Sequence, residues 1–379
     1  MRVAIDVRTV TEARSGVGNY VLNLLAGLRR VAPQHEFFLV GQERNLEVLG
    51  RSNGLCHRAL LSHESHPWGD LWEHLWLPRV LKRHGVQVMH GPATLIPLGR
   101  DGFASVATIH DLVAFLYPET IPQKYALYMT WLLKRVVKRA MRIISVSQCT
   151  KDDLVRVLGV PPERIAVIHE AAQPGFQPIA DQEALQRARR RYGISKPFFY
   201  HVGNIEPRKN LVRLLKAFLS LRHRFKGQVQ MVISGQEGWL TRRLHGDIGR
   251  LDLGQDVIFT GYLPQEDLPL LMNAALAFVF PSLYEGFGLP ALEAMSCGTP
   301  LITSNLSSLP EIVGPAALLV EPTQVEDIAQ AMWRVFEDAG LRQRMSRLGL
   351  EQAARFSWQQ TARQTMEVYL EAHRERTGS

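Results

Sequence analysis

Short apolar runs alternate with longer amphipathic stretches along the chain, and this alternation most constrains its fold. A run of about four to eight apolar residues is typical of a buried strand, and a longer amphipathic stretch is typical of a helix. Their repeated succession favours parallel sheets with helices on both faces, an α/β fold. The expected strands are Arg2–Val7, Glu36–Val40, Val86–His90, Ser105–Ile109, Arg142–Val146, Phe198–Val202, Gln228–Ser234, Asp256–Thr260, Ala277–Phe280 and Pro300–Ser304. The expected helices are Gly18–Val31, Lys124–Met141, Asp181–Tyr192, Asn210–Arg224, Leu240–Leu251, Gln265–Ala274 and Leu289–Cys297.

The length of 379 residues exceeds what one hydrophobic core usually serves, so two domains are expected. A Pro/Gly-interrupted stretch over 171–178 predicts that the boundary lies between Glu170 and Lys196. The apolar fraction of 46% and the charged fraction of 21% are those of a soluble globular protein.

Composition also indicates the compartment and the kind of partner. Only Cys56, Cys149 and Cys297 occur, without a Cys-x-x-Cys pair, which favours a reducing cytoplasm. No signal peptide is recognisable, and no run of about 18 apolar residues predicts a membrane span. The formal net charge of +8 favours an anionic partner, either nucleotide phosphates or a lipid surface. Recognisable nucleic-acid modules are absent from the sequence, so no nucleic acid is expected.

The segment after the expected strand Ala277–Phe280 combines a glycine-rich turn with a helix start. The helix Leu289–Cys297 is followed by Gly298, which is placed to end it. Backbone N–H groups and the helix dipole at such a turn attract phosphate. Glu285 in the turn and Glu293 on the helix can accept hydrogen bonds from sugar or ribose hydroxyls. The segment therefore predicts a nucleotide-sugar site. The alternative is that Glu285 caps the turn and Glu293 is a solvated helix residue.

A second phosphate site is expected where the strand Phe198–Val202 ends. Arg208 and Lys209 lie in the following turn, and Asn210 is placed to cap the next helix. Cationic side chains beside a helix start can neutralise a diphosphate. The alternative is a solvated basic turn.

His110 and Gly16 lie near strand ends in the first half of the chain. Asp111 follows His110 and can orient nearby backbone or the imidazole. Gly16 lies in a loop where glycine lets the backbone approach a ligand closely. This loop fails as a dinucleotide fingerprint because Val21 stands where the third glycine is needed. The alternatives are that His110 has only a structural role and that the loop with Gly16 is only a tight turn into a helix.

These motifs together resemble those of retaining glycosyltransferases of family 4, which have the two-domain GT-B fold. Glu285 and Glu293 match the family's Glu-x7-Glu signature, and Lys209 matches its phosphate-binding lysine. The family's arginine position holds Asn204, so one phosphate ligand is missing, and Arg208 is the expected substitute. The resemblance extends over nearly the whole chain and is strongest in the second half.

The resemblance implies two Rossmann-like, doubly wound parallel-sheet domains that face a central cleft. An acceptor-side domain is expected over 1–172, a linker and crossover helix over 173–196, and a donor domain over 197–357. A C-terminal helix over 358–379, with Ser357 as its N-cap, is expected to pack back on the N-terminal domain.

The resemblance also implies roles for individual residues. It places His110 beside the donor sugar as a hydrogen-bond partner, Glu285 on the sugar hydroxyls and Glu293 on the ribose. Lys209 and Arg208 are expected to neutralise the diphosphate leaving group. Further donor-binding residues are expected at Gly16, Asn204, Gly235, Leu263, Phe287, Gly288 and Leu289.

The implied reaction moves a hexosyl unit from a nucleoside-diphosphate sugar to a hydroxyl of a glycan or lipid-linked glycan, as in bacterial polysaccharide synthesis. GDP-mannose is preferred as the donor over UDP-glucose or UDP-N-acetylglucosamine. No cofactor is expected, and no metal, because the sequence contains no Asp-x-Asp motif. The alternatives are a non-catalytic nucleotide-sugar binder and another GT-B enzyme, such as an epimerase or a phosphorylase.

Basic residues follow one face of the expected helix Lys124–Met141 and continue just beyond it. They are Lys134, Arg135, Lys138, Arg139 and Arg142. Tyr128 and Trp131 lie about one turn earlier. The pattern indicates either a patch that contacts an anionic membrane at its inner face or a solvated amphipathic helix.

Overall fold

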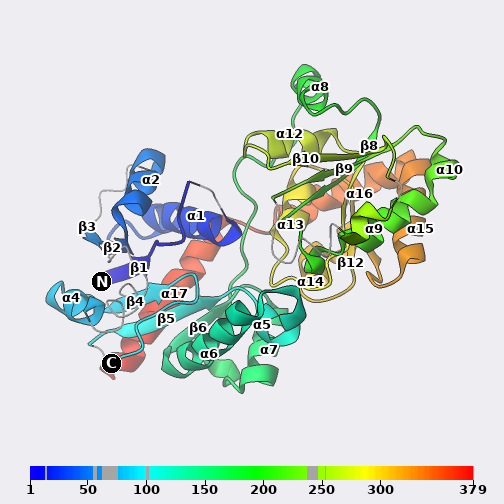
Figure 1. The fold of residues 1–379 in the computed structure, drawn as a ribbon. Helices are drawn as coiled ribbons and strands as arrows, with labels where there is room; N and C mark the ends of the chain where they lie inside the picture. The colour runs from blue at the N-terminus through cyan, green and yellow to red at the C-terminus, as the bar shows by residue number, and fades with distance from the viewer. Residues whose placement is uncertain are drawn as a thin grey trace. The chain divides into compact units, whose positions relative to one another are not determined.

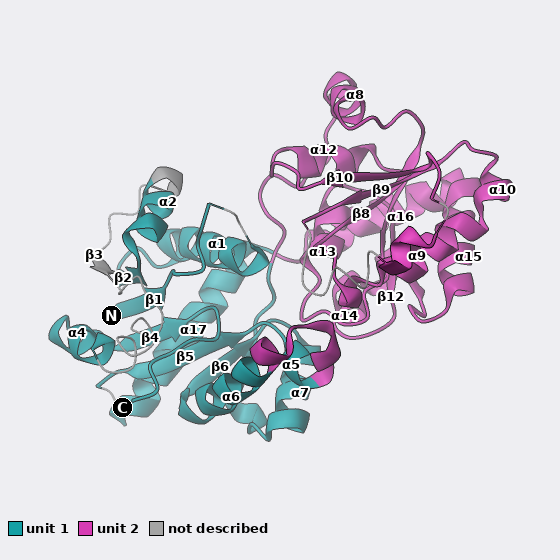
Figure 2. Ribbon diagram, viewed as in Figure 1, with its two compact units in different colours: residues 1–115, 127–170, 357–379 teal, residues 116–126, 171–356 magenta. Residues whose placement is uncertain are grey.

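The chain was analysed as a computed structural model (Figure 1). The structure describes residues 1–12, 15–53, 58–61, 76–99, 102–236, 246–251 and 253–378. Cys56, Arg14 and the first part of the expected helix Leu240–Leu251 lie outside the described residues. Contacts divide the chain into two compact units (Figure 2). Unit 1 comprises Met1–Phe115, Leu127–Glu170 and Ser357–Ser379, and unit 2 comprises Leu116–Ala126 and Ala171–Phe356.

Unit 1 is built on a seven-stranded parallel sheet with the order β3-β2-β1-β4-β5-β6-β7. Its strands are β1 (Arg2–Asp6), β2 (Glu36–Gly41), β3 (Arg58–Leu61), β4 (Val88–Gly91), β5 (Ala104–Ile109), β6 (Arg142–Ser145) and β7 (Ile165–Val167). Its helices are α1 (Gly16–Val31), α2 (Glu43–Asn53), α4 (Leu77–Arg83), α6 (Gln123–Arg139), α7 (Gln148–Leu158), η2 (Pro162–Arg164) and α17 (Trp358–Thr377). The first residues of α6 belong to unit 2, and α5 (Val113–Leu116) lies at the boundary between the units.

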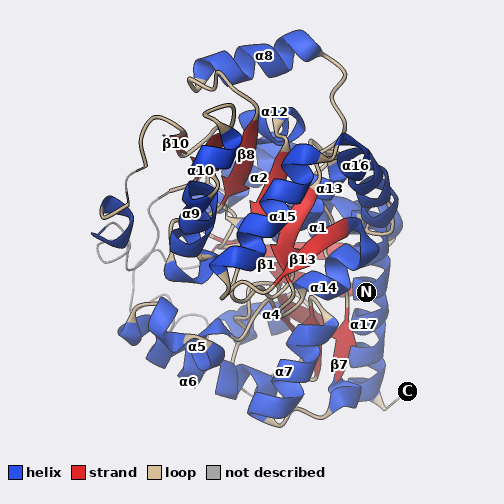
Figure 3. Cartoon of the chain, turned by 90° about the vertical axis from the view of Figure 1, so that its right-hand side faces the viewer, coloured by secondary structure: helices blue, strands red, loops and turns tan. Residues whose placement is uncertain are grey.

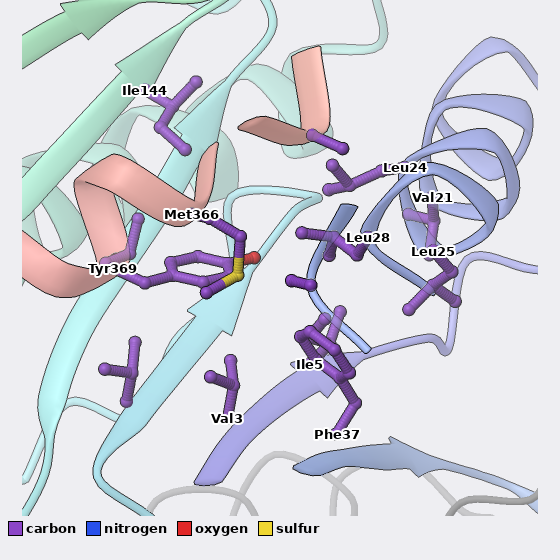
Figure 4. Close-up of a cluster of buried hydrophobic side chains, with 14 of the residues drawn as sticks. Val3, Ile5, Val21, Leu24, Leu25, Leu28, Phe37, Ile144, Met366 and Tyr369 are labelled. Carbon is purple, nitrogen blue, oxygen red and sulfur yellow. The ribbon is translucent and has the colours of Figure 1, made fainter. Parts of the chain in front are cut away.

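Side chains alternate between the two faces of this sheet. Val3 and Ile5 of β1 belong to a core formed with α1 and α17, and Ala4 belongs to a second core with α4. Figure 4 shows Met366 and Tyr369 of α17 in the first of these cores, together with residues of α1 and β1. The helices α1 and α17 approach closely at Gly27, where an added Cβ would lie 2.7 Å from the Trp358 carbonyl oxygen. The C-terminal helix is therefore part of the unit that contains the N-terminus.

Unit 2 is built on a six-stranded parallel sheet with the order β10-β9-β8-β11-β12-β13. Its strands are β8 (Phe198–Val202), β9 (Gln230–Ser234), β10 (Val257–Gly261), β11 (Ala277–Phe280), β12 (Leu301–Ser304) and β13 (Ala317–Val320). Its helical segments are η1 (Pro118–Thr120), α8 (Gln182–Arg191), η3 (Pro207–Lys209), α9 (Leu211–Ser220), α10 (Arg222–Phe225), α12 (Asp267–Ala274), α13 (Leu289–Ser296), α14 (Leu309–Val313), η4 (Gly314–Ala316), α15 (Val325–Glu337) and α16 (Ala339–Ala353). Figure 3 shows helices packed around the strands, as expected for an α/β fold.

The ten expected strands are all present, within a few residues of their expected ends. The short strands β3, β7 and β13 were not predicted. β7 has only three residues, which is too few for an alternating or apolar pattern to stand out.

The expected helix Asn210–Arg224 is wrong in detail. It divides into α9 and α10, and Asn210 adopts φ 62° and makes no side-chain cap. Its amide instead donates to the carbonyl oxygens of Pro281 at 3.0 Å and Pro322 at 2.6 Å. Asn210 therefore ties together the loops that follow β11 and β13.

Candidate functional site

The strands β8 and β11 are parallel neighbours in unit 2, so the loops that leave their carboxyl ends lie side by side. The loop after β8 carries Arg208 and Lys209, and the loop after β11 carries Glu285. This pairing of strands explains why residues that are 76 positions apart in the chain meet at one edge of the sheet.

Glu285 is buried at the centre of a charged cluster. Lys209 Nζ lies 2.6 Å from its Oε1, and Arg208 contacts its Oε2 at 3.0 Å. The Ser282 hydroxyl also donates to Oε1, at 2.6 Å. The alternative of a solvated basic turn is wrong for Lys209, which is buried, and Arg208 is its neighbour in the same cluster.

The cluster has two carboxylates for its two cations. Arg208 also bonds Glu206, at 2.6 Å, and donates to the Tyr284 carbonyl oxygen at 2.6 Å. Burial alone would raise the pKa of Glu285, but the charges of Arg208 and Lys209 outweigh it and lower that pKa to about 2. Glu285 is therefore ionised at neutral pH, whereas burial lowers the pKa of the Lys209 ammonium beside it.

The turn after Glu285 leads into α13 as the sequence predicts. Gly288 precedes the helix with φ 101°, and an added Cβ there would lie 2.7 Å from a methyl carbon of Leu309. Phe287 and Gly288 are buried, and the first residue of the helix is Leu289. The Ser308 hydroxyl lies 2.9 Å from the carbonyl oxygens of both Glu285 and Phe287. This serine holds the turn at the N-terminus of α13.

Glu293 lies on α13, and it is buried, so the alternative of a solvated helix residue is wrong. Gln173 donates to its Oε1 at 3.1 Å, and Gln265 in turn donates to Gln173. Glu293 is thus held by Gln173, which is itself held by Gln265.

An apolar cavity of 520 Å³ opens at the carboxyl ends of β9 and β10. Its lining residues are Ile205, Ile233, Gly235, Gln236, Ile248, Phe259, Gly261 and Tyr262. Gly235 packs so closely against the loop after β8 that an added Cβ would lie 1.9 Å from the Gly203 carbonyl oxygen. Leu263 is buried and does not line this cavity, and Asn204 is exposed at the end of β8. The cavity has the size and lining of a small-molecule site.

In unit 1, both nitrogens of His110 have partners. Nδ1 lies 3.0 Å from Glu170 Oε1, and Nε2 lies 2.8 Å from the Pro92 carbonyl oxygen. Burial lowers the pKa of His110, but the hydrogen bond and charge of Glu170 outweigh it, with smaller contributions from Pro92 and Asp111, so the pKa is raised. Asp111 accepts a hydrogen bond from the Val113 backbone at 3.0 Å. Asp111 therefore orients backbone, and Glu170 holds the imidazole.

Gly16 is the first residue of α1, and it is exposed, with nothing within 4 Å of an added Cβ. Ser15 caps the helix by accepting a hydrogen bond from Gly18 at 3.0 Å. Close packing instead requires Gly18, where an added Cβ would lie 2.7 Å from the Thr9 carbonyl oxygen.

Sequence reasoning did not find Glu170, Ser282 or Ser308 as parts of these sites. Ser282 and Ser308 belong to no motif with a recognisable spacing, and the sequence marked Glu170 only as the start of the domain boundary.

A further buried group is His201, whose Nδ1 lies 2.9 Å from the Val279 carbonyl oxygen. Burial, the largest cause, lowers the pKa of His201 to about 4. No group of three or more His, Cys, Asp or Glu residues in the described part of the chain is arranged to hold a metal ion.

The fold and the site define the class of protein. Two α/β units, with a Lys–Glu–Arg cluster beside a helix N-terminus in the second, are the arrangement of a GT-B glycosyltransferase. Residues 185–352 match the family model "Glycosyl transferases group 1", and residues 14–173 match the model "Glycosyltransferase Family 4".

The chain belongs to this glycosyltransferase family. It is 33% identical to the O-antigen chain mannosyltransferase B of Escherichia coli, over 97% of this chain and 99% of that relative. It is also 34% identical to the serotype-specific mannosyltransferase WbdA of Escherichia coli, over 72% of this chain but only 34% of that longer relative.

Comparison with solved structures shows the GT-B fold. The crystal structure of Anabaena HepE in complex with UDP-glucose aligns with a TM-score of 0.77 and 18% sequence identity, and the alignment covers 98% of this chain and 100% of the other. Within the described ranges, every helix is too short or too polar to span a bilayer.

Proposed function

We propose that this glycosyltransferase moves a mannosyl unit, with retention of configuration and without a metal ion or other cofactor, from GDP-mannose to a hydroxyl of a glycan or lipid-linked glycan. The similarity to two mannosyltransferases supports the choice of sugar, and the name of the first supports an acceptor of the O-antigen type.

The observation that carries the proposal is the contact of Lys209 and Arg208 with Glu285 at the N-terminal end of α13. A leaving diphosphate develops negative charge as the bond to the sugar breaks. Buried cations and the helix N-terminus stabilise that charge more strongly than water does, because the groups are already oriented. We assign this role to Lys209, Arg208 and the backbone of Phe287–Leu289.

Glu285 has a second role in this proposal. Without a donor it balances the charge of Lys209, so the buried lysine is not left unpaired. When the donor binds, the diphosphate shares the cations, and a Glu285 oxygen becomes available to accept hydrogen bonds from sugar hydroxyls. The acceptor hydroxyl then attacks on the face that the diphosphate leaves, and a phosphate oxygen takes the proton.

The apolar cavity is the proposed place for the nucleobase. Phe259 and Tyr262 supply aromatic surface, the backbone approaches closely at Gly235, and Gln236 supplies an amide for base edges. Glu293 on α13 is the proposed ribose partner and would exchange its contact with Gln173 for ribose hydroxyls.

Donor hydrolysis and transfer, measured with GDP-mannose, UDP-glucose and UDP-N-acetylglucosamine in parallel, test the proposal. We expect turnover of GDP-mannose, unchanged in excess chelator, with an α-linked product seen by NMR from the α-linked donor. Manganese-dependent activity or an inverted product would contradict the mechanism, and turnover of a UDP-sugar alone would contradict the donor.

The same assay separates the other possible functions. Binding without turnover would indicate a non-catalytic binder, and a changed sugar on the recovered nucleotide would indicate an epimerase. Phosphate-dependent release of sugar phosphate would indicate a phosphorylase.

The role of Lys209 can be tested with the variant Lys209→Ala. Lys216→Ala, on the exposed face of α9, is a matched control and should leave turnover unchanged.

A further inference from the structure

The outer face of α6 carries large apolar side chains that are exposed. Leu127 is 65% exposed, Trp131 is 45% exposed and Tyr128 is 41% exposed. The opposite face of the same helix is buried, and it is formed by Leu132, Leu133, Val136 and Val137. The exposed apolar residues therefore form a second apolar stripe, on the side away from the core.

Basic side chains continue this stripe toward the C-terminal end of the helix. Lys134, Arg135 and Lys138 are exposed, and the Arg135 guanidinium stacks 3.9 Å above the Trp131 ring. The α6 sequence, QKYALYMTWLLKRVVKR, contains five basic residues and no acidic one. We call Leu127, Tyr128, Trp131, Lys134, Arg135 and Lys138 the α6 surface.

The α6 surface contains fewer basic residues than the basic face expected from the sequence, because it lacks Arg139 and Arg142. Arg139 turns to the Gly99 carbonyl oxygen at 2.5 Å and the Ser105 hydroxyl at 3.1 Å. Arg142 pairs with Glu375 at 3.0 Å and donates to the Glu163 carbonyl oxygen at 2.7 Å. Both arginines are structural, so the prediction that they belong to the patch is wrong.

We infer that the α6 surface binds the face of an anionic lipid bilayer. Tyr and Trp favour the headgroup level of a bilayer, where the ring is in apolar surroundings and the polar tip is hydrated. Leu127 adds apolar area that can enter the boundary with the acyl chains. The basic side chains interact with anionic headgroups over a distance set by the Debye length. The helix thus combines the two contributions that hold an amphipathic helix in a membrane interface.

Charge argues against a second copy of this chain as the partner. A two-fold contact would place the α6 surface against itself, and the exposed Lys134, Arg135 and Lys138 would face like charges. Because α6 contains no acidic residue, the helix itself offers nothing to balance them. A negatively charged surface is the complementary partner.

The experiment is co-sedimentation of the full chain with vesicles of phosphatidylcholine alone and of equimolar phosphatidylcholine and phosphatidylglycerol. Because no sugar donor is present, its result does not depend on the proposed function. Lys134→Glu, Arg135→Glu and Lys138→Glu, made together, should weaken partition into the anionic vesicles at least about a hundredfold. Trp131→Ala with Leu127→Ala should weaken it about tenfold.

The matched control reverses three exposed charges elsewhere, with Arg187→Glu and Arg190→Glu on α8 and Lys216→Glu on α9. This variant has the same net charge as the α6 triple variant, and we expect it to keep most of the binding. An equal loss of vesicle binding in both triple variants would show that only the net charge of the protein matters, and it would overturn the proposal.

Three further results would also overturn it. They are equal binding to both kinds of vesicle, unchanged binding after the α6 charge reversal, and self-association in sedimentation velocity that the α6 variants abolish. Melting curves of each variant should stay close to that of the wild type, because every substituted side chain is exposed and the surface ion pairs of Arg187 with Asp181 and Glu183 contribute little stability. Fluorescence quenching by brominated lipid, compared between wild type and Trp131→Phe, reports the α6 contact directly and should be smaller in the variant.

Discussion

Replacing Lys209 by alanine should slow transfer far more than it weakens binding of the nucleoside. Lys209 Nζ lies 2.6 Å from Glu285 in a buried cluster at the proposed diphosphate site. The cavity proposed for the nucleobase is lined by other residues, which include side chains of β9 and β10 as well as the loops after β8, β9 and β10. The variant should therefore lose transfer activity while it keeps most of its affinity for the nucleoside.

The expected magnitude follows from the nature of the contact. A buried, charge-assisted contact to a developing leaving group is worth about 2–4 kcal/mol of transition-state stabilisation. This corresponds to a fall of roughly 30- to 1000-fold in kcat/KM. The free energy of unfolding should fall by less than the roughly 3–5 kcal/mol that breaking a buried ion pair usually costs. Glu285 keeps Arg208 at 3.0 Å and the Ser282 hydroxyl at 2.6 Å after the change.

The assay compares kcat/KM for transfer with the Kd of the nucleoside from calorimetry, at a temperature where melting curves show the variant to be folded. Lys216→Ala serves as the control. Wild-type turnover in Lys209→Ala would refute the reasoning, and so would an equal loss of nucleoside affinity, which would place Lys209 at the base.

Other perturbations give distinct expected results. Glu285→Gln should mainly lower kcat, whereas Glu293→Gln should mainly raise the donor KM, because ribose contacts are equal in the ground and transition states; steady-state kinetics of both variants would expose a reversal of roles. His110, held by Glu170, should titrate by NMR above its ordinary pKa of 6.5. The contribution of protonated His110 to stability is complete below pH 6.5 and is lost as the pH rises through the raised pKa. Glu170→Gln should lower the pKa of His110 toward its ordinary value, and an unshifted pKa in the wild type would contradict the pairing. Gly235→Ala should lower the melting temperature and weaken nucleoside binding, because its Cβ would meet the Gly203 carbonyl oxygen at 1.9 Å; Gly249→Ala, with open space around it, should do neither.

Local patterns predicted the parts of the candidate site that lie within one strand–turn–helix segment. The strand β11, the turn with Glu285 and the helix α13 ending before Gly298 follow from the apolar run and the glycine positions. The presence of Lys209 and Arg208 at the same edge also follows, because parallel strands end at one edge of a sheet.

Contacts between distant residues were not predictable in the same way. Glu170 is 60 residues from His110, and no periodicity connects them. Asn210 was expected to cap a helix because its position suited one, but its amide satisfies carbonyl groups of two other loops. Whether Arg139 is exposed depends on where the Gly99 carbonyl lies, and a helical-face pattern contains no information about that.

The return of α17 to unit 1 has a consequence for the order in which the protein assembles on the ribosome. Leu24 and Leu28 of α1 share a core with Met366 and Tyr369, which are synthesised after all of unit 2 (Figure 4). Unit 2 ends at Phe356, so nearly all of its contacts can form while unit 1 still lacks a helix. The unit that begins first is thus the last to close, and until α17 has been synthesised and has left the ribosome the apolar face of α1 depends on other cover, such as a chaperone.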